Sequence, residues 1–342
     1  MRFFIFLIAI TSLVSCQTDL EIPFPKHEPK LVLNSYMIED GAIFLYLTRS
    51  FGALETVVDS NLIVRDAEVS VWKDGTKLAD MSLIRDVNDT IVFDGTSGVL
   101  DTFIQNIIAN VYLPDVELPA PTPGETYEFR AVHPTYGAAS GQVNVLPKPQ
   151  IESVTLVRDT ITTTDFDGYQ DVWSAMKISV QDPGEYNNFY KFGMRLKYVQ
   201  AYDDGFGNIF IDTVDYFNSV ATGITRSADG VIYGNYNPVS DTEINGQTGE
   251  LFAWVRLPNC CGYPSDLSSR PDIELLEIGV EVYIMDENFG LFDSKHQLQY
   301  QSRTEGIESA ILPREPVSVN GNVVDGYGLV ASFNYLYQEV EL

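Results

Sequence analysis

The chain of 342 residues carries a formal net charge of −27 at pH 7, and 45% of its residues are hydrophobic and 12% aromatic. So strong a negative field repels nucleic-acid phosphates and anionic lipid headgroups, so composition disfavours both as binding partners. The apolar content is sufficient for a packed core, which argues against an intrinsically disordered chain.

The first fifteen residues have the three regions of a secretory signal peptide. Arg2 supplies the positive charge, residues 3–10 form a short apolar run, and small residues precede a cleavage point. The run is shorter than the roughly 20 apolar residues of a membrane-spanning helix. Leu13-Val14-Ser15-Cys16 resembles a lipobox, which directs diacylglycerol onto the cysteine sulfur, whereas the alternative is an ordinary signal peptide with a chance cysteine. We therefore expect a lipoprotein with Cys16 as its lipidation site.

Residues 16–26 form the expected lipidated tether. Its start, Gln17-Thr18-Asp19-Leu20-Glu21, is similar to the acidic stretch that follows the lipidated cysteine of surface-displayed lipoproteins in Bacteroidota. A solvated polar tether would have the same composition. A multiply acylated cysteine anchors a protein stably, so we expect a lipid-anchored protein of the outer membrane. The acidic stretch favours a position on the face toward the cell exterior.

Most of the remaining chain predicts an all-β fold. Short runs rich in Val, Ile, Tyr, Phe and Thr alternate with clusters of Gly, Pro, Asn and Asp. Pro147-Lys148-Pro149 interrupts regular pairing and predicts a boundary between domains at 27–148 and 149–342. Examples of the predicted strands are Leu31–Met37, Ala42–Thr48, Ala67–Trp72, Tyr127–His133, Gly141–Leu146, Ile151–Arg158, Ala175–Val180, Phe189–Val199 and Glu274–Ile284.

The first domain is predicted to be an immunoglobulin-like or transthyretin-like sandwich. Residues 66–75 alternate apolar and polar positions and end in Asp74-Gly75, a strong hairpin signal. A turn at Pro123-Gly124 precedes another alternating strand. The stretch Phe103–Val111 and the Pro-rich loop at 114–123 do not alternate and indicate a short helix or an insertion.

The second domain is predicted to be larger and rich in β-strands, with one helix near its end. Residues 287–303 lack strand alternation and place Phe289, Phe292 and His296 at helical spacing.

Two acidic segments are candidate calcium sites, because hard cations prefer clustered oxygen ligands on turns. The glycine and glutamate of an EF-hand are missing from the first, and a solvated acidic hairpin loop is the favoured interpretation of either segment, so we expect no cofactor. Calcium is the only cofactor that the sequence suggests. The first candidate consists of Asp165, Asp167 and Asp171, and the second of Asp203, Asp204, Asn208 and Asp212.

The two remaining cysteines, Cys260 and Cys261, are adjacent. Their Cα atoms lie about 3.8 Å apart across a trans peptide, closer than the usual disulfide range of about 4.4–6.8 Å. They could form a strained vicinal disulfide in a turn-rich loop, or stay free thiols on either side of a turn. A metal pair is the least favoured reading, because zinc sites usually space cysteines by two to four residues.

After the lipobox, several short motifs follow one another along the chain: Lys30–Tyr36, Ala67–Val71, Pro123–Tyr127, Asp182-Pro183-Gly184 with Asn187–Tyr190, and Asn320–Asn322 with Asp325–Gly328. In order and spacing they resemble the Bacteroidota lipoprotein family catalogued as domain of unknown function 4249. The resemblance covers nearly the whole mature chain and implies no catalytic residues. It implies a setting beside TonB-dependent outer-membrane receptors. The late loop departs from the family's usual Asn-Gly-Gly-like element.

No enzyme signature stands out in the sequence, so we expect a protein without catalytic residues. The turns around Ser97 and Ser140 do not match a nucleophile elbow, and no phosphate-binding or dinucleotide motif occurs. The leading hypothesis is an accessory or ligand-capture partner of a TonB-dependent or other outer-membrane β-barrel. The alternatives are a surface glycan hydrolase using paired carboxylates and an envelope scaffold.

Overall fold

The computed structural model describes residues 27–52, 55, 62–83, 111–164, 170–203, 209–219, 223–226, 232–235, 237–257, 273–304 and 321–340. Strands dominate this part of the chain, which confirms the all-β class. Its single α-helix, α3 (Glu287–Thr304), confirms the helix predicted over 287–303. Within the same residues, no helix is long and apolar enough to cross a membrane.

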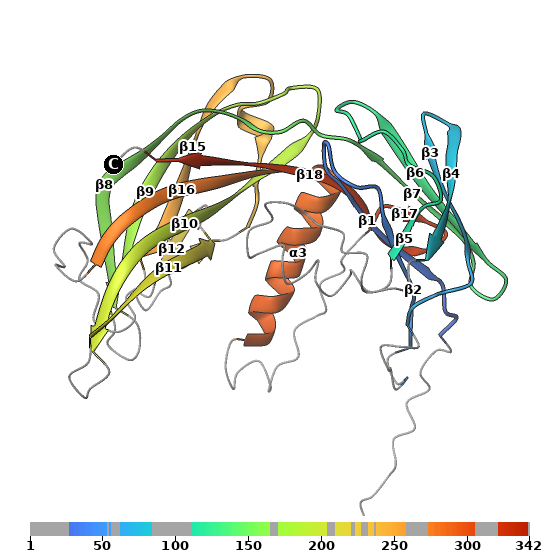
Figure 1. Ribbon diagram of the computed structural model, residues 1–342, viewed down its shortest axis with the longest axis horizontal. Helices are drawn as coiled ribbons and strands as arrows, with labels where there is room; N and C mark the ends of the chain where they lie inside the picture. Colours follow the sequence, from blue (N-terminus) through green and yellow to red (C-terminus); the bar gives the residue numbers. More distant parts are fainter. Residues whose placement is uncertain are drawn as a thin grey trace, which may run out of the picture.

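The N-terminal lobe is a curled sheet that encloses its own core (Figure 1). Asp74 and Gly75, with φ of 48° and 79°, form the two-residue turn between β3 and β4 and confirm the predicted hairpin. Alternate strand residues such as Leu31, Leu33 and Phe129 point inward and are fully buried. The strands are β1 (Leu31–Met37), β2 (Leu45–Arg49), β3 (Glu68–Lys73), β4 (Thr76–Leu83), β5 (Val111–Pro114), β6 (Thr126–His133) and β7 (Gly137–Asn144).

The C-terminal lobe is a sandwich of two sheets. Strands β8 (Gln150–Thr164), β9 (Gln170–Gln181) and β15 (Thr248–Leu257) form a three-stranded sheet. It shares a core, including Met176, Ile178, Tyr190 and Val280, with the sheet formed by the long strands. Those strands are β10 (Asn188–Asp203), β11 (Ile209–Ser219), β16 (Ile273–Asp286) and β18 (Tyr327–Glu339). The shorter elements of this lobe are β12 (Gly223–Arg226), β13 (Ile232–Asn235), β14 (Val239–Ser240) and the 3-10 helix η3 (Asp241–Glu243), whereas β17 (Val323–Val324) pairs with β7 of the first lobe.

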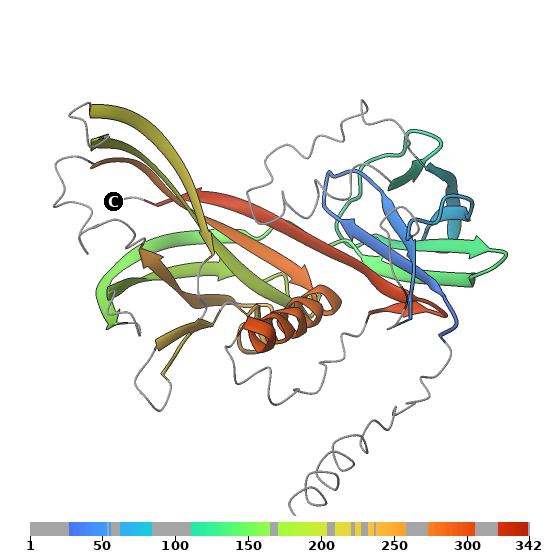
Figure 2. The same ribbon diagram turned by 90° about the horizontal axis from the view of Figure 1, so that it is seen from below.

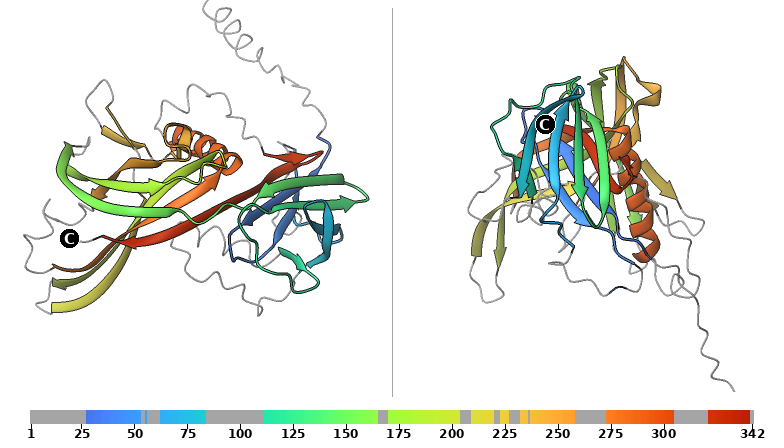
Figure 3. Two further views of the ribbon diagram at one scale, coloured as in Figure 1. Left: turned by 90° about the horizontal axis from the view of Figure 1, so that it is seen from above. Right: turned by 90° about the vertical axis from the view of Figure 1, so that its right-hand side faces the viewer.

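Strand β18 joins the two lobes into one 13-stranded sheet (Figures 2 and 3). Its first half pairs in parallel with β1, from Val32 opposite Tyr327 to Met37 opposite Ser332. Its second half pairs antiparallel with β16. The domain boundary expected after residue 148 stays a prediction, but the C-terminal strand contributes to both lobes.

Side chains of β18 fasten the junction between the lobes. The hydroxyl of Ser332 donates to the carbonyl of Met37 at 3.0 Å and accepts from the Leu146 amide at 3.0 Å. The Asn334 amide donates to the Leu146 carbonyl at 2.5 Å and accepts from the Glu39 N–H at 3.1 Å. These buried bonds fix the end of the first lobe against the strand that leads into the second.

Helix α3 packs across this junction beside β18 (Figures 1 and 2). Phe289 contacts the rings of Tyr36 and Phe333, with centroids 5.4 and 5.6 Å away. Lys191 on β10 forms a half-buried ion pair of 2.8 Å with Asp293. The helix therefore binds strands of both lobes.

Replacing Gly290 by valine should displace α3. A Cβ atom at Gly290 would lie 2.3 Å from Cγ of Phe189, so the helix and β10 must separate to admit it. We expect a loss of about 1–3 kcal/mol in the free energy of unfolding, measured by urea denaturation. Leu291→Ala at the next, exposed position is the control and should cost less. Equal losses in the two variants would contradict close packing at Gly290.

Candidate binding groove between the two lobes

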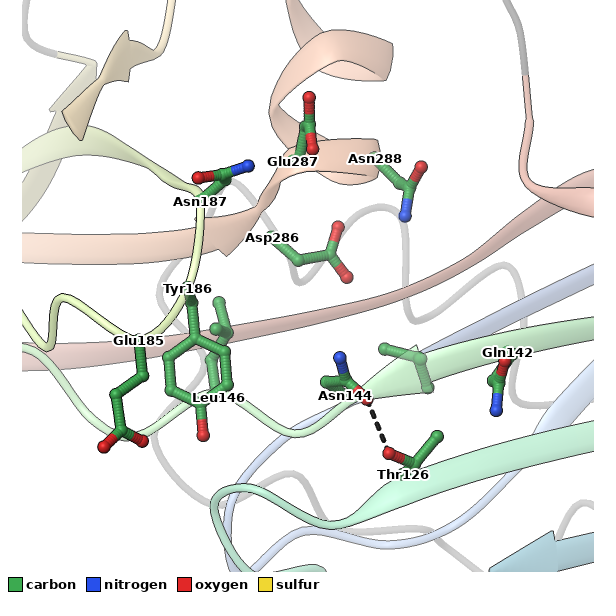
Figure 4. A pocket seen from close by; sticks show the side chains of 11 residues that line it. Thr126, Gln142, Asn144, Leu146, Glu185, Tyr186, Asn187, Asp286, Glu287 and Asn288 are labelled. Atoms are coloured by element: carbon green, nitrogen blue, oxygen red, sulfur yellow. Dashed lines mark hydrogen bonds between the residues drawn. The ribbon is translucent and has the colours of Figure 1, made fainter. Parts of the chain in front are cut away.

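A polar groove of about 440 Å³ lies where the two lobes meet α3 (Figure 4). This volume is within the range of small-ligand sites. Residues from three parts of the structure line it. They are Thr126, Gln142, Val143, Asn144 and Leu146 from the first lobe, Glu185, Tyr186 and Asn187 before β10, and Asp286, Glu287 and Asn288 at the start of α3.

The first wall is held by the Pro123–Tyr127 turn. Gly124 has a φ of 86°, a conformation that favours glycine, and its N–H donates to the Val145 carbonyl at 3.0 Å. Burial raises the pKa of Glu125, but hydrogen bonds from Lys73, Thr122 and Tyr127 outweigh it and hold the pKa at about 2. The charged carboxylate thus fixes the turn that presents Thr126.

The second wall follows the Asp182-Pro183-Gly184 turn. The buried carboxylate of Asp182 accepts from the N–H groups of Gly184 and Gly246, each at 2.9 Å, and from the Tyr190 hydroxyl at 2.8 Å. Those bonds lock the loop that carries Tyr186. A Cβ atom on Gly124 would lie only 3.3 Å from the Tyr186 hydroxyl, so this side chain reaches across to the first lobe.

Asp286 connects the groove to the junction. Its carboxylate caps α3 by accepting from the Phe289 N–H at 2.8 Å, and it accepts from the Ser332 N–H of β18 at 2.5 Å. Burial raises the pKa of Asp286 to about 6, although the backbone hydrogen bonds act in the opposite direction. The carboxyl that faces the groove therefore titrates closer to neutral pH than an ordinary aspartate.

Asp286 should make the stability of the chain depend on pH. Because its folded pKa of about 6 lies above its usual 3.8, protonation favours the folded state. The stabilising contribution is complete below about pH 4 and disappears as the pH rises through about 6. We expect the stability of the wild type relative to Asp286→Asn to fall by about 2 kcal/mol between pH 4.5 and 7.5, followed by urea denaturation. A difference that stays constant with pH would contradict the raised pKa.

The groove combines amide side chains from both lobes with a lining that has no cationic residue. Asn144 accepts a hydrogen bond from the Thr126 hydroxyl at 2.6 Å, which leaves its N–H₂ group available. Within the described part of the chain, the amide side chains of Gln142, Asn187 and Asn288 have no hydrogen-bond partner. None of the described lining residues is Lys, Arg or His. Such a surface suits a ligand that both donates and accepts hydrogen bonds.

None of the site residues predicted from sequence is among the described residues that line this groove. Cys16, with the signal peptide and the tether, lies outside the described residues, as do Cys260 and Cys261 and the stretch 103–110. Asp165, Asp167, Asp204 and Asn208 also lie outside them, and for Asp171, Asp203 and Asp212 only the backbone is described. Both acidic segments connect or flank antiparallel hairpins, β8–β9 and β10–β11. Among the side chains that the structure does describe, no group of three His, Cys, Asp or Glu could hold a metal ion.

The three histidines make local contacts. His27 pairs with the Ser50 hydroxyl at 3.0 Å. Nδ1 of the buried His133 accepts from the N–H groups of Thr135 and Tyr136, and its Nε2 lies 3.1 Å from Asp66. The ring of His296 stacks on Phe292 with centroids 6.2 Å apart.

Sequence reasoning missed the groove because no single segment forms it. One residue had a usable local signal: Asp286 immediately precedes the predicted helix, where aspartate is a preferred N-cap. Asn187 belonged to a motif noted only for its turn, Asn144 lay inside the predicted strand Gly141–Leu146, and Tyr186 belonged to no motif.

The fold and groove define a two-lobed all-β protein whose lobes share one strand and enclose a polar groove. The chain belongs to the family described as domain of unknown function DUF4249, whose model matches residues 17–339. No curated protein matches it. Among solved structures, the B domain of a biofilm-associated protein aligns over 91% of this chain and 86% of its own, with 8% identity and a TM-score of 0.15. At that score the alignment carries no inference about this chain.

Proposed function

We propose that the protein is a lipid-anchored protein of the outer membrane that faces the cell exterior and captures a ligand for a neighbouring β-barrel, TonB-dependent or other. The observation that supports ligand capture is the groove at the lobe junction, with its unpartnered amides on both sides. The lipobox-like Leu13–Cys16 and the acidic residues after it support the proposed location on the outer membrane. In this proposal the chain needs no cofactor.

The arrangement favours binding over catalysis. Two-carboxylate glycosidases place their acidic groups facing one another across the scissile bond. Figure 4 shows the carboxylate of Asp286 directed into the groove, whereas Glu185 and Glu287 point away from it. Asp286 also accepts hydrogen bonds from α3 and β18, which gives it a structural task.

Glycan hydrolysis stays the second candidate for one reason. A carboxyl group with a pKa near 6 in a groove is a feature of general acids. Release of reducing sugars from a surface glycan by the wild type, abolished in Asp286→Asn, would favour hydrolysis over capture. No feature of the groove favours the remaining candidate, an envelope scaffold without a ligand.

Affinity purification from detergent-solubilised outer membranes tests the barrel partnership. The full chain would carry a tag after its C-terminal residue, with chemical crosslinking before solubilisation. We expect a β-barrel protein to be recovered with the wild type and to be lost with Cys16→Ser, which cannot be anchored beside it. Recovery of the lipoprotein without any barrel would count against the partnership.

A further inference from the structure

We infer that the groove takes a neutral, hydroxyl-rich ligand of the carbohydrate class. This inference rests on the proposed ligand-capture function and specifies its ligand. It follows from three features of the groove: which groups point into it, how their charge is compensated, and how its two sides are held.

The groups that point into the groove are hydrogen-bonding groups. Figure 4 shows the Asp286 carboxylate and the Asn288 amide on one side and the Asn144 amide on the other, directed toward the same space. Amides offer both donors and acceptors, and a carboxylate accepts two hydrogen bonds. Neighbouring hydroxyls of a sugar, each both donor and acceptor, match this set. An apolar ligand would leave these groups without partners, which is costly.

The charge of the groove excludes anions and does not require a cation. No cationic side chain is present among the described lining residues, and the chain has a net charge of −27. An anionic ligand would therefore be repelled. The carboxylate that points inward, Asp286, already accepts from the backbone N–H groups of Phe289 and Ser332, at the positive end of the α3 dipole. Those N–H groups offset part of the carboxylate charge, so the carboxylate does not need a cationic ligand and a neutral ligand fits best.

Both sides of the groove are held in place before any ligand arrives. Glu125 and Asp182 fix the two turns, and the bonds of Ser332 and Asn334 fix the lobes. A pre-formed site spends little binding energy on ordering itself. Tyr186 lines the groove, and its ring offers an apolar face of the kind on which sugar rings stack.

The test is binding of the full chain, purified in detergent, to a glycan array that includes neutral, anionic and cationic oligosaccharides of equal length. We expect binding to neutral members and none to oligogalacturonate, whereas any binding of chitosan oligomers, which the net charge of −27 attracts, should disappear at high salt. Titration calorimetry with the strongest neutral oligosaccharide then gives the affinity. Absence of any neutral ligand at millimolar concentration, or binding only to charged glycans, would overturn the inference.

Two variants test whether the ligand binds in the groove. Asn144→Ala and Asn288→Ala should each weaken binding about tenfold, because each removes hydrogen bonds to the ligand. Both side chains are exposed, so the fold should be kept. Gln338→Ala, an exposed amide elsewhere on β18, is the matched control and should bind as the wild type does. Unchanged affinity in both groove variants would overturn the assignment.

The outcomes separate the ligand from the partnership. If a barrel is recovered from membranes but no neutral glycan binds, the ligand class is wrong and the accessory function stands. If glycans bind through the groove but no barrel is recovered, the ligand class stands and the partnership fails.

Discussion

A Cys16→Ser chain should carry no fatty acid and should be absent from the outer membrane. The thiolate is the nucleophile that accepts diacylglycerol, and a serine hydroxyl cannot replace it. Because cleavage before Cys16 follows lipidation, the variant should also accumulate as a precursor that keeps residues 1–15. The measurement is incorporation of radiolabelled palmitate together with membrane fractionation.

The other two cysteines supply the control for this experiment. Cys260→Ser and Cys261→Ser should take up label as the wild type does, because neither stands in a lipobox. Palmitate on the Cys16→Ser chain would overturn the lipoprotein assignment. Loss of label in a Cys260 or Cys261 variant would show that the acyl chain is attached to that cysteine and not to Cys16.

Local patterns predicted several of the strands and the helix. Leu31–Met37 was predicted with the bounds that β1 has, because inward and outward residues alternate along a half-buried strand. Helix α3 followed from the spacing of Phe289, Phe292 and His296, and the structure packs the first two against β18 and its neighbours.

What the sequence did not predict depends on contacts between distant segments. Residues 329–334 of β18 are all buried, so this strand lacks the alternation by which strands are recognised. Its parallel pairing with β1 joins residues nearly 300 positions apart and leaves no local pattern. The groove has the same origin, since Asn144, Tyr186 and Asp286 meet only after β18 has joined the lobes.

The late loop at residues 320–328 departs from the family pattern, which left its role open. The close pairing of β18 with β1 requires glycine in this loop. Gly328 has a φ of 113°, and a Cβ atom there would lie 2.0 Å from the Leu33 carbonyl oxygen on β1. In the same hairpin, the Asn322 side chain donates to the Val330 carbonyl and accepts from the Val330 N–H. The loop thus starts the strand that unites the two lobes.

Gly328→Ala should therefore be the most destabilising of the single substitutions considered. The clash is with backbone atoms of a paired strand, which cannot rotate away as a side chain does. Backbone strain and overpacking together should cost about 3–5 kcal/mol in the free energy of unfolding, measured by urea denaturation. Gly75→Ala is the matched control, because Gly75 has a φ of 79° and no atom within 4 Å of its Cβ position.

The control carries the strain of a positive φ without the clash, so it should lose about 1–2 kcal/mol. The difference between the two variants measures how tightly β18 lies against β1. If Gly328→Ala loses no more than Gly75→Ala, the strand pairing is looser than its register implies. In that case the lobes would be held mainly by the Ser332 and Asn334 bonds, and the groove walls would be free to move relative to one another.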